Sequence, residues 1–336
     1  MTYFKFFNLE LFIIFFSILF VNVLILTFRN NLASLLNIFD QPNKRKIHKY
    51  PTPLVGGICL FITISIALVL NLFENYLSVA KFNIYVLFYL VFFTIGLWDD
   101  AKSLSPKIKT FLITATIIIF IPFESDFVIR ELNFKYTNKQ IILGNFSLLF
   151  TIFCIFALYN ALNFIDGYNG SATSIMIFWT FILLIKNPNT LYFLTIMIMV
   201  LIFFYNISGK TFLGNSGTSL LSIFFSLSII NDYNIIKTIY ADEILLILLF
   251  PGLDMIRVTF ERILNKKKVY YPDKTHFHHY LIKKNIHYIW QSIIILTIMP
   301  LILLYIIKNI IVTIFISILV YYILLIYLKK KSNDKN

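Results

Sequence analysis

Charged residues are scarce in this 336-residue sequence, because Asp, Glu, Lys and Arg together make up only 13% of it. Soluble domains carry roughly twice that share, about 25%. Apolar residues reach 59%, and mean hydropathy is +0.82. The composition therefore excludes an ordinary soluble protein and predicts a membrane protein that crosses the bilayer several times.

Cysteine is nearly absent, and both cysteines, Cys59 and Cys154, lie within apolar runs. Their spacing indicates neither a disulfide framework nor a metal-binding motif, so we expect them to act as small apolar side chains. A cleavage pattern is also missing after the first apolar run, at about residues 9–28. That run has roughly the 20 residues of a spanning helix, which favours a retained helix over a signal peptide.

Ionisable residues are nearly missing from the interiors of the apolar runs. Transporters coupled to protons or ions commonly place acids near the middle of the bilayer, so this absence disfavours a lipid or sugar transporter. The run lengths predict an all-α polytopic membrane fold with about eleven transmembrane helices. The predicted spans cover residues 9–28, 54–73, 83–98, 110–122, 147–165, 171–186, 190–207, 218–230, 243–256, 289–307 and 310–328.

Most of the 29 basic residues are concentrated in alternate loops. Because such loops face the cytoplasm, this pattern predicts an external N-terminus and a cytoplasmic C-terminus. The net charge of +13 is then largely a property of the cytoplasmic face, where it attracts anionic lipids. We expect a single domain over residues 1–336, with cytoplasmic segments at about 29–53, 99–109, 166–170, 208–217 and 257–288 and a basic tail at 329–336. Alternating apolar and polar residues within 123–146 predict a short external hairpin.

Five polar motifs fall on the predicted cytoplasmic face. The first, residues 40–57, reads DQPNKRKIHKYPTPLVGG, and its prolines and final glycines favour a shaped loop over a flexible basic one. The second, residues 96–109, reads GLWDDAKSLSPKIK and ends a span with Asp99 and Asp100. Adjacent carboxylates at a helix C-terminus oppose the helix dipole, so the pair indicates a bound cation such as Mg²⁺ rather than a plain helix end.

Two further motifs combine glycines with polar side chains at span ends. NALNFIDGYNG, residues 160–170, places Asn163 and Asp166 where lipid contact would be costly, which indicates a polar cavity or a hydrogen-bonded helix C-cap. FLGNSGTS, residues 212–219, forms a glycine turn ahead of a span. Such a turn suits an anionic phosphate, and an ordinary helix N-cap explains it equally well.

The fifth motif, residues 251–281, places Arg257 and Arg262 in an expected amphipathic helix and ends in a histidine cluster. A zinc site is one interpretation of that cluster, although no cysteine accompanies it. Histidine and arginine donors to phosphate agree better with the surrounding charge. Together, the five motifs predict a diphosphate ligand that approaches from the cytoplasm and a second substrate that enters from the bilayer.

In this order, the five motifs resemble those of the polyprenyl-phosphate N-acetylhexosamine-1-phosphate transferases of glycosyltransferase family 4, with the WecA-like branch closer than the MraY branch. The resemblance implies transfer of a sugar 1-phosphate, by default GlcNAc-1-phosphate, from a UDP-sugar to undecaprenyl phosphate. It implies Mg²⁺, with Mn²⁺ as an alternative, and UMP as the second product. It also implies a multi-pass protein of the bacterial inner membrane that starts a cell-envelope glycan without binding nucleic acid, and it leaves a homodimer open.

Residue by residue, the resemblance implies catalytic acids at Asp99, Asp100 and Asp166, with Asp99 as the candidate base for direct attack by the lipid phosphate. The implied metal ligands are Asn215, Asp100 and Asp166. The implied substrate-binding residues are Arg45, His48, Lys109, Asn163, Asn169, His276, His278 and His279.

Asn169 and Asn215 depart from the family pattern, which usually has Asp at both positions. An amide oxygen can coordinate Mg²⁺ but adds no charge, so we expect weaker metal binding at Asn215. This departure leaves open the alternative that the chain is a non-catalytic relative, which binds lipid phosphate or acts as a scaffold. The retained Asp99, Asp100 and Asp166 favour the enzyme.

Overall fold

The structure is a computed structural model, and it describes residues 9–42, 50–73, 78–268 and 274–333. The chain forms two compact units. Unit 1 contains Met1–Thr116 and Met176–Phe225, and unit 2 contains Ile117–Ile175 and Ser226–Asn336.

Unit 1 is built from helices and one short strand pair. Its elements are α1 (Leu9–Thr27), α2 (Arg29–Leu36), β1 (Phe39–Asp40), β2 (Thr52–Pro53), α3 (Gly56–Phe73), α4 (Val79–Lys102) and α8 (Thr190–Ile207). Three more helices contribute residues to both units: α5 (Pro106–Phe120), α7 (Ser171–Lys186) and α9 (Gly214–Asn231).

Unit 2 contains the remaining helices and a second strand pair. Its α-helices are α6 (Ser147–Ile165), α10 (Ala241–Leu264), α11 (Phe277–Lys283), α12 (Ile289–Ile307) and α13 (Ile310–Asn333). Its short elements are η2 (Ile121–Phe123), η3 (Ser125–Phe127), β3 (Glu131–Phe134), β4 (Lys139–Ile142), η4 (Gly144–Phe146) and the π-helix η5 (Asp232–Ile236).

The predicted all-α polytopic membrane fold is confirmed, because each of the predicted spans coincides with a helix. Within the described part of the chain, seven helices are long and apolar enough to cross a membrane. The pair α1 and α2, bent by 70°, adds an eighth if it is one span. Helices α3 and α7 are shorter, and α10 carries charged residues near its C-terminal end.

The core of unit 1 is aromatic and aliphatic. Helix α3 packs against α4 and α8. The rings of Phe61 and Phe93 stack at 4.3 Å between centroids, and those of Trp179 and Phe225 at 4.9 Å. The strands β1 and β2 pair Asp40 with Thr52, so the first polar motif is fixed at both of its ends, as a shaped loop requires.

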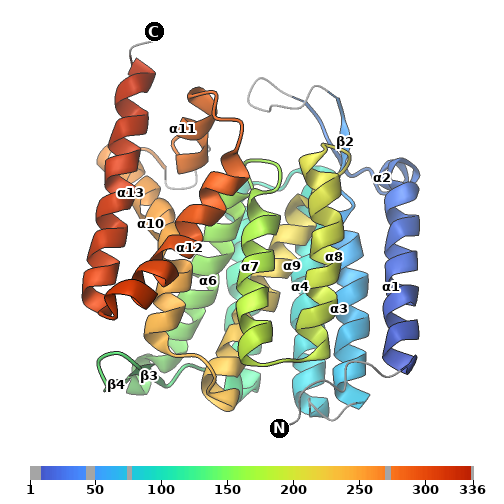
Figure 1. The fold of residues 1–336 in the computed structure, drawn as a ribbon. Helices are drawn as coiled ribbons and strands as arrows, with labels where there is room; N and C mark the ends of the chain where they lie inside the picture. Colours follow the sequence, from blue (N-terminus) through green and yellow to red (C-terminus); the bar gives the residue numbers. More distant parts are fainter. Residues whose placement is uncertain (1–8, 43–49, 74–77, 269–273, 334–336) are drawn as a thin grey trace. The chain divides into compact units, whose positions relative to one another are not determined.

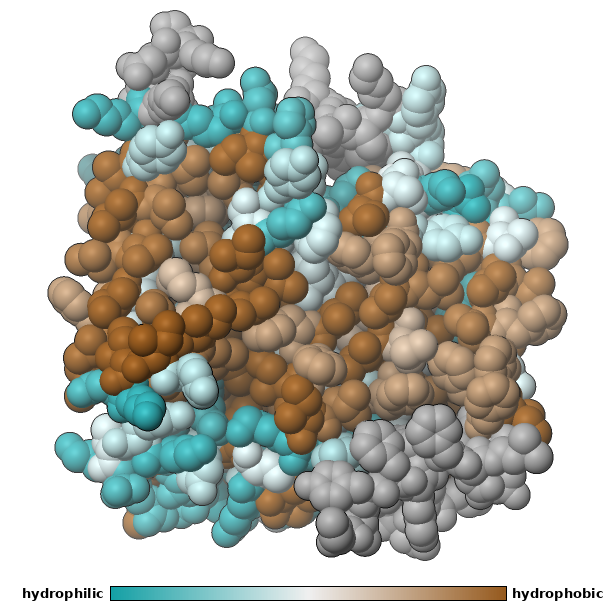
Figure 2. Space-filling model, viewed as in Figure 1, coloured by the Kyte–Doolittle hydropathy of each residue, from teal (hydrophilic) through white to brown (hydrophobic). Residues whose placement is uncertain are grey.

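In unit 2, α10 packs against α6, α12 and α13. The strands β3 and β4 form an antiparallel hairpin that pairs Glu131 with Ile142, which confirms the predicted hairpin. The hairpin and α11 lie at opposite ends of this unit (Figure 1). Hydrophobic side chains cover the middle of α12 and α13, and hydrophilic ones gather at the ends, as expected for helices in a bilayer (Figure 2).

Candidate active site

The acidic pair lies in the last turn of α4, in unit 1. Asp99 holds the end of this helix, because its Oδ1 accepts a hydrogen bond from the amide of Leu104 at 2.7 Å and its carbonyl accepts one from the amide of Ser103 at 2.8 Å. Ser103 adopts the left-handed conformation (φ 51°), which terminates α4. The second carboxylate oxygen of Asp99, Oδ2, contacts a side chain from another element.

That element is α5, whose Lys109 joins two of the polar motifs. Its ammonium lies 2.9 Å from Oδ2 of Asp99 and donates to Oδ1 of Asn215 at 2.7 Å. The side chains of Lys109 and Asp99 are only 16% and 10% exposed, so solvent screens this contact less than a surface ion pair. Unit 1 therefore brings Asp99, Lys109 and Asn215 together around one positive charge.

Asp100 caps the N-terminus of α9. Its carboxylate accepts hydrogen bonds from the backbone amides of Asn215 (2.7 Å) and Ser216 (2.9 Å) and from the hydroxyl of Ser216 (2.7 Å). The first amides of a helix lack intrahelical partners, and its N-terminus attracts negative charge. The predicted phosphate-binding turn therefore holds a carboxylate of the chain itself in this structure.

Gly214 is required for this cap. Its φ of +75° favours glycine, and a Cβ atom there would lie 2.6 Å from Oδ2 of Asp100. Gly57 and Gly96 also face the turn, because an added Cβ would overlap Ser216 or the carbonyl of Asn215. These glycines allow α3 and α4 to approach the backbone at the start of α9.

The end of the first polar motif holds the same turn from its other side. The amides of Gly56 and Gly57 donate to the carbonyls of Phe212 (3.1 Å) and Leu213 (3.0 Å), and the amide of Phe212 donates to Pro53 (2.9 Å). Motifs more than 150 residues apart are thus joined by main-chain hydrogen bonds. Arg45 and His48, which the sequence assigns to substrate binding, lie outside the described residues.

The oxygen atoms of unit 1 have the chemistry that Mg²⁺ prefers. Asp99 and Asn215 each direct an oxygen at a cation, which in this structure is the ammonium of Lys109. Asp100 accepts three hydrogen bonds from Asn215 and Ser216 at the start of α9. The donor set fits a divalent cation by ligand type.

In unit 2, the third polar motif forms the end of α6 and the turn before α7. The amide of Asn163 donates to the carbonyl of Tyr159 at 3.2 Å, and Asp166 is the C-cap residue of α6. The turn closes on Gly170, whose φ is +84°. Asn169 lies in this turn and is half-buried.

The three histidines of the fifth motif lie together at the start of α11. The rings of His276 and His278 are parallel, with centroids 5.8 Å apart, and the rings of His278 and His279 lie 4.1 Å apart. Nδ1 of His276 faces the carboxylate of Asp254 at 3.0 Å. Within the described ranges no three His, Cys, Asp or Glu side chains are arranged to hold a metal ion, so the zinc interpretation gains no support.

His278 is buried against the turn that follows α6. Burial, together with the neighbouring His279 and His276, holds its pKa well below the usual value for histidine. Its Nε2 atom has no hydrogen-bond partner among the described residues, and an added Cβ at Gly167 would overlap it. The neutral ring therefore requires a glycine opposite it.

Comparison with known proteins supports the resemblance found in the motifs, because residues 82–232 match the description glycosyl transferase family 4.

Among the proteins similar to this chain is the probable undecaprenyl-phosphate N-acetylglucosaminyl 1-phosphate transferase of Bacillus subtilis strain 168. It is 27% identical over 276 residues, which cover 78% of this chain and 74% of the relative. The undecaprenyl-phosphate alpha-N-acetylglucosaminyl 1-phosphate transferase of Escherichia coli strain K12 is 27% identical over 80% of this chain and 75% of its own. The Yersinia pestis protein of the same name is 26% identical over 74% and 70%.

Sequence reasoning missed two residues beside the histidine cluster: Asp254, which faces His276, and Tyr321, which donates to Asp254. Asp254 lies in the fifth motif without a role assigned to it, and Tyr321 lies in an aromatic-rich span. Both side chains are buried. The sequence offered one signal for Asp254. It is an acid four residues after Phe250, in the same expected helix as Arg257 and Arg262.

Proposed function

We propose that this chain transfers a sugar 1-phosphate, by default GlcNAc-1-phosphate, from a UDP-sugar to undecaprenyl phosphate. The observation that carries the proposal is its similarity to transferases with this activity in their names, over about three quarters of both chains. The half-buried acids Asp99 and Asp100 of unit 1 and the histidines and arginines of unit 2 supply side chains suited to phosphate chemistry.

In the proposed reaction, an oxygen of the lipid phosphate forms a bond to the phosphorus that carries the sugar. The bond from that phosphorus to the bridging oxygen breaks, and UMP leaves with the electron pair. Asp99 takes the proton of the attacking phosphate. Lys109, which contacts Asp99 at 2.9 Å, stabilises the carboxylate and supplies positive charge for a phosphate oxyanion.

The roles proposed for unit 2 concern the nucleotide sugar. Asn163 and the histidine cluster provide hydrogen-bond donors for the diphosphate, and Asn169 provides an amide that can both donate to and accept from a uracil edge. Neutral His278 can donate a hydrogen bond without adding charge. Positioning and charge neutralisation are the main demands of phosphoryl transfer.

Mg²⁺ is the proposed cofactor, with Asp100, Asp166 and Asn215 as the proposed ligands. When bound, it would neutralise negative charge on the diphosphate. Asn215→Asp tests this assignment, because a second carboxylate beside Asp99 adds negative charge where Lys109 now lies. We expect the Mg²⁺ concentration for half-maximal UMP release to fall several-fold. An unchanged requirement would mean that the metal is held elsewhere.

The proposal is tested with membranes that contain the protein, undecaprenyl phosphate, Mg²⁺ and a panel of UDP-sugars, with UMP release as the measurement. We expect release with at least one N-acetylhexosamine nucleotide. The matched control is Asp99→Asn, which keeps the side-chain shape and is expected to bind UDP-sugar while forming no lipid-linked product. If no UDP-sugar in the panel gives UMP release while an active relative does, the enzyme hypothesis is rejected and the scaffold hypothesis is favoured.

A further inference from the structure

Asp254 is the centre of a buried hydrogen-bond network in unit 2. Its carboxylate accepts from Arg257 Nη2 (2.7 Å), from the hydroxyl of Tyr321 (2.9 Å) and from the amide of Phe277 (3.1 Å), and it faces His276 Nδ1 at 3.0 Å. A carboxylate has about four acceptor sites, so the chain itself fills all of them. Asp254 therefore has no capacity left for substrate or metal.

This network decides which nitrogen of His276 carries a proton. A carboxylate that already accepts from a guanidinium, a phenol and an amide is ionised and can only accept a further hydrogen bond. Nδ1 of His276 must then be the donor. In that tautomer Nε2 is an acceptor, and Arg262 Nη2 lies 3.5 Å from it.

Arg262 is held from a second side as well. Its guanidinium lies 5.5 Å from the centroid of the Phe164 ring, and it is only 3% exposed. The ring of Phe164 also lies 4.7 Å from that of His276. Phe164 belongs to the end of α6, next to Asn163, so His276 and Phe164 together orient a buried cation toward the third polar motif.

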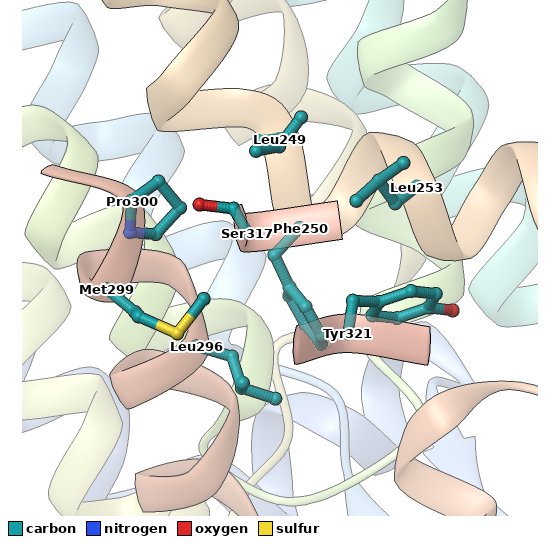
Figure 3. A pocket seen from close by; sticks show the side chains of 8 residues that line it. All are labelled: Leu249, Phe250, Leu253, Leu296, Met299, Pro300, Ser317 and Tyr321. Atoms are coloured by element: carbon teal, nitrogen blue, oxygen red, sulfur yellow. The ribbon is translucent and has the colours of Figure 1, made fainter. Parts of the chain in front are cut away.

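The last helix completes the arrangement. Arg257 Nε donates to the hydroxyl of Tyr321 at 2.8 Å, so one phenol joins the guanidinium to Asp254. The ring of Tyr321 lines a small apolar cavity of about 10 Å³ between α10, α12 and α13, and its hydroxyl points away from Met299 and Pro300 (Figure 3). The ring thus packs with the apolar residues while only the hydroxyl enters the network.

We propose that His276 is a positioning residue: Asp254 and Tyr321 fix its Nδ1–H tautomer, so that its Nε2 orients Arg262 instead of binding a substrate phosphate. The three histidines then have two different roles. His276 orients Arg262 in the protein interior, while His278 and His279 keep the proposed role of binding the substrate. The functional consequence rests on the proposed transferase activity, whereas the tautomer does not.

The tautomer is tested by nitrogen NMR of the full-length protein in nanodiscs, labelled on histidine, with the His276 signals assigned from His276→Gln. We expect protonated Nδ1 and unprotonated Nε2. In Asp254→Asn, whose amide nitrogen cannot accept, we expect the Nε2–H form to gain population, whereas Asp254→Glu should retain much of the wild-type signal. A wild-type ring protonated mainly on Nε2, or no change in Asp254→Asn, would overturn the proposal.

The kinetic consequence is tested with Tyr321→Phe, and the matched control is Tyr322→Phe, whose ring is 42% exposed on the same helix. Losing a hydrogen bond to a charged group corresponds to about a 10-fold effect. We expect the KM for the UDP-sugar to rise about that much in Tyr321→Phe, with kcat and the KM for the lipid phosphate little changed. If Tyr321→Phe and Tyr322→Phe change the KM for the UDP-sugar equally, or if neither changes it, the proposed role of Tyr321 is contradicted. If no UDP-sugar supports turnover, the NMR result still decides the tautomer.

Discussion

At the residue scale, two glycines with similar backbones differ in what surrounds them. Gly214 has φ +75° and faces Asp100, whereas Gly209 has φ +68° and open space around it. Each change to alanine costs about 1–2 kcal/mol for the left-handed backbone. Only Gly214→Ala must also displace the carboxylate that caps α9.

The prediction is that Gly214→Ala lowers the melting temperature in detergent more than Gly209→Ala does, and that it alone abolishes UMP release. Thermal unfolding and the transferase assay check the two parts. Similar losses in the two variants would mean that the contact with Asp100 contributes nothing beyond backbone strain.

His278 gives a pH dependence whose sign follows from its burial. Its folded pKa lies below the unfolded value of about 6.5, so the unfolded chain binds more protons in that range. The stabilisation is therefore complete above about pH 6.5 and is lost as the pH falls. The groups that face the ring are His279 and His276, which add to the lowering of the pKa of His278, and Asp254, which opposes it.

We predict that the melting temperature falls between pH 7.5 and pH 5 and that His278→Gln makes this decline shallower. His287→Gln, at an exposed position, is the matched control and should leave the slope unchanged. An identical slope in wild type and His278→Gln would show that the ring does not titrate differently on folding.

At the element scale, helices were predictable and their ends were not. Runs of apolar residues identify the spans because a bilayer requires that length. The pattern does not say that α4 continues to Lys102, which places the acidic pair inside a helix, or that α9 begins at Gly214. The end of α4 depends on Asp99 and Ser103, and the start of α9 depends on the Asp100 cap, a contact between residues 115 apart in sequence.

The same limit applies to the candidate site. The acids, amides and histidines could be named from the motifs, because such groups are costly beside lipid unless they serve a polar site. The partner of Asn215 could not be named from the motifs, because Lys109 is 106 residues away in the sequence. Tyr321 gave no signal at all, because the sequence contains 20 tyrosines and periodicity does not distinguish one hydroxyl from another.

The hairpin is an element whose stability depends on one side chain of η5. The hydroxyl of Tyr233 accepts from the amide of Asn133 at 2.6 Å and donates to the carbonyl of Glu131 at 2.9 Å. Tyr233→Phe removes both bonds and should raise the exchange rate of the strand β3 amides, at a cost of about 1–3 kcal/mol. Hydrogen exchange followed by mass spectrometry measures this.

Tyr136→Phe, in the turn between the strands, is the control and should leave exchange unchanged. UMP release should be retained in both variants, because the hairpin lies at the end of unit 2 opposite α11. Loss of turnover in Tyr233→Phe alone would mean that the hairpin influences the reaction.

At the scale of the whole molecule, the distribution of basic residues predicts which end of each helix faces the cytoplasm. The structure is consistent with this in unit 2, where the hairpin and α11 lie at opposite ends of the same helices. Lys139 lies in the hairpin and Lys267 follows α10, and both are exposed. They provide one reporter position for each side of the membrane.

One added cysteine at a time tests the orientation with a membrane-impermeant maleimide. Lys139→Cys should be labelled on cells whose inner membrane is intact, and Lys267→Cys only after that membrane is permeabilised. The wild-type chain is the background control, because Cys59 is buried and Cys154 lies within α6, so neither should react. The opposite labelling pattern would reverse the topology and place the histidine cluster outside, where a cytoplasmic UDP-sugar could not reach it.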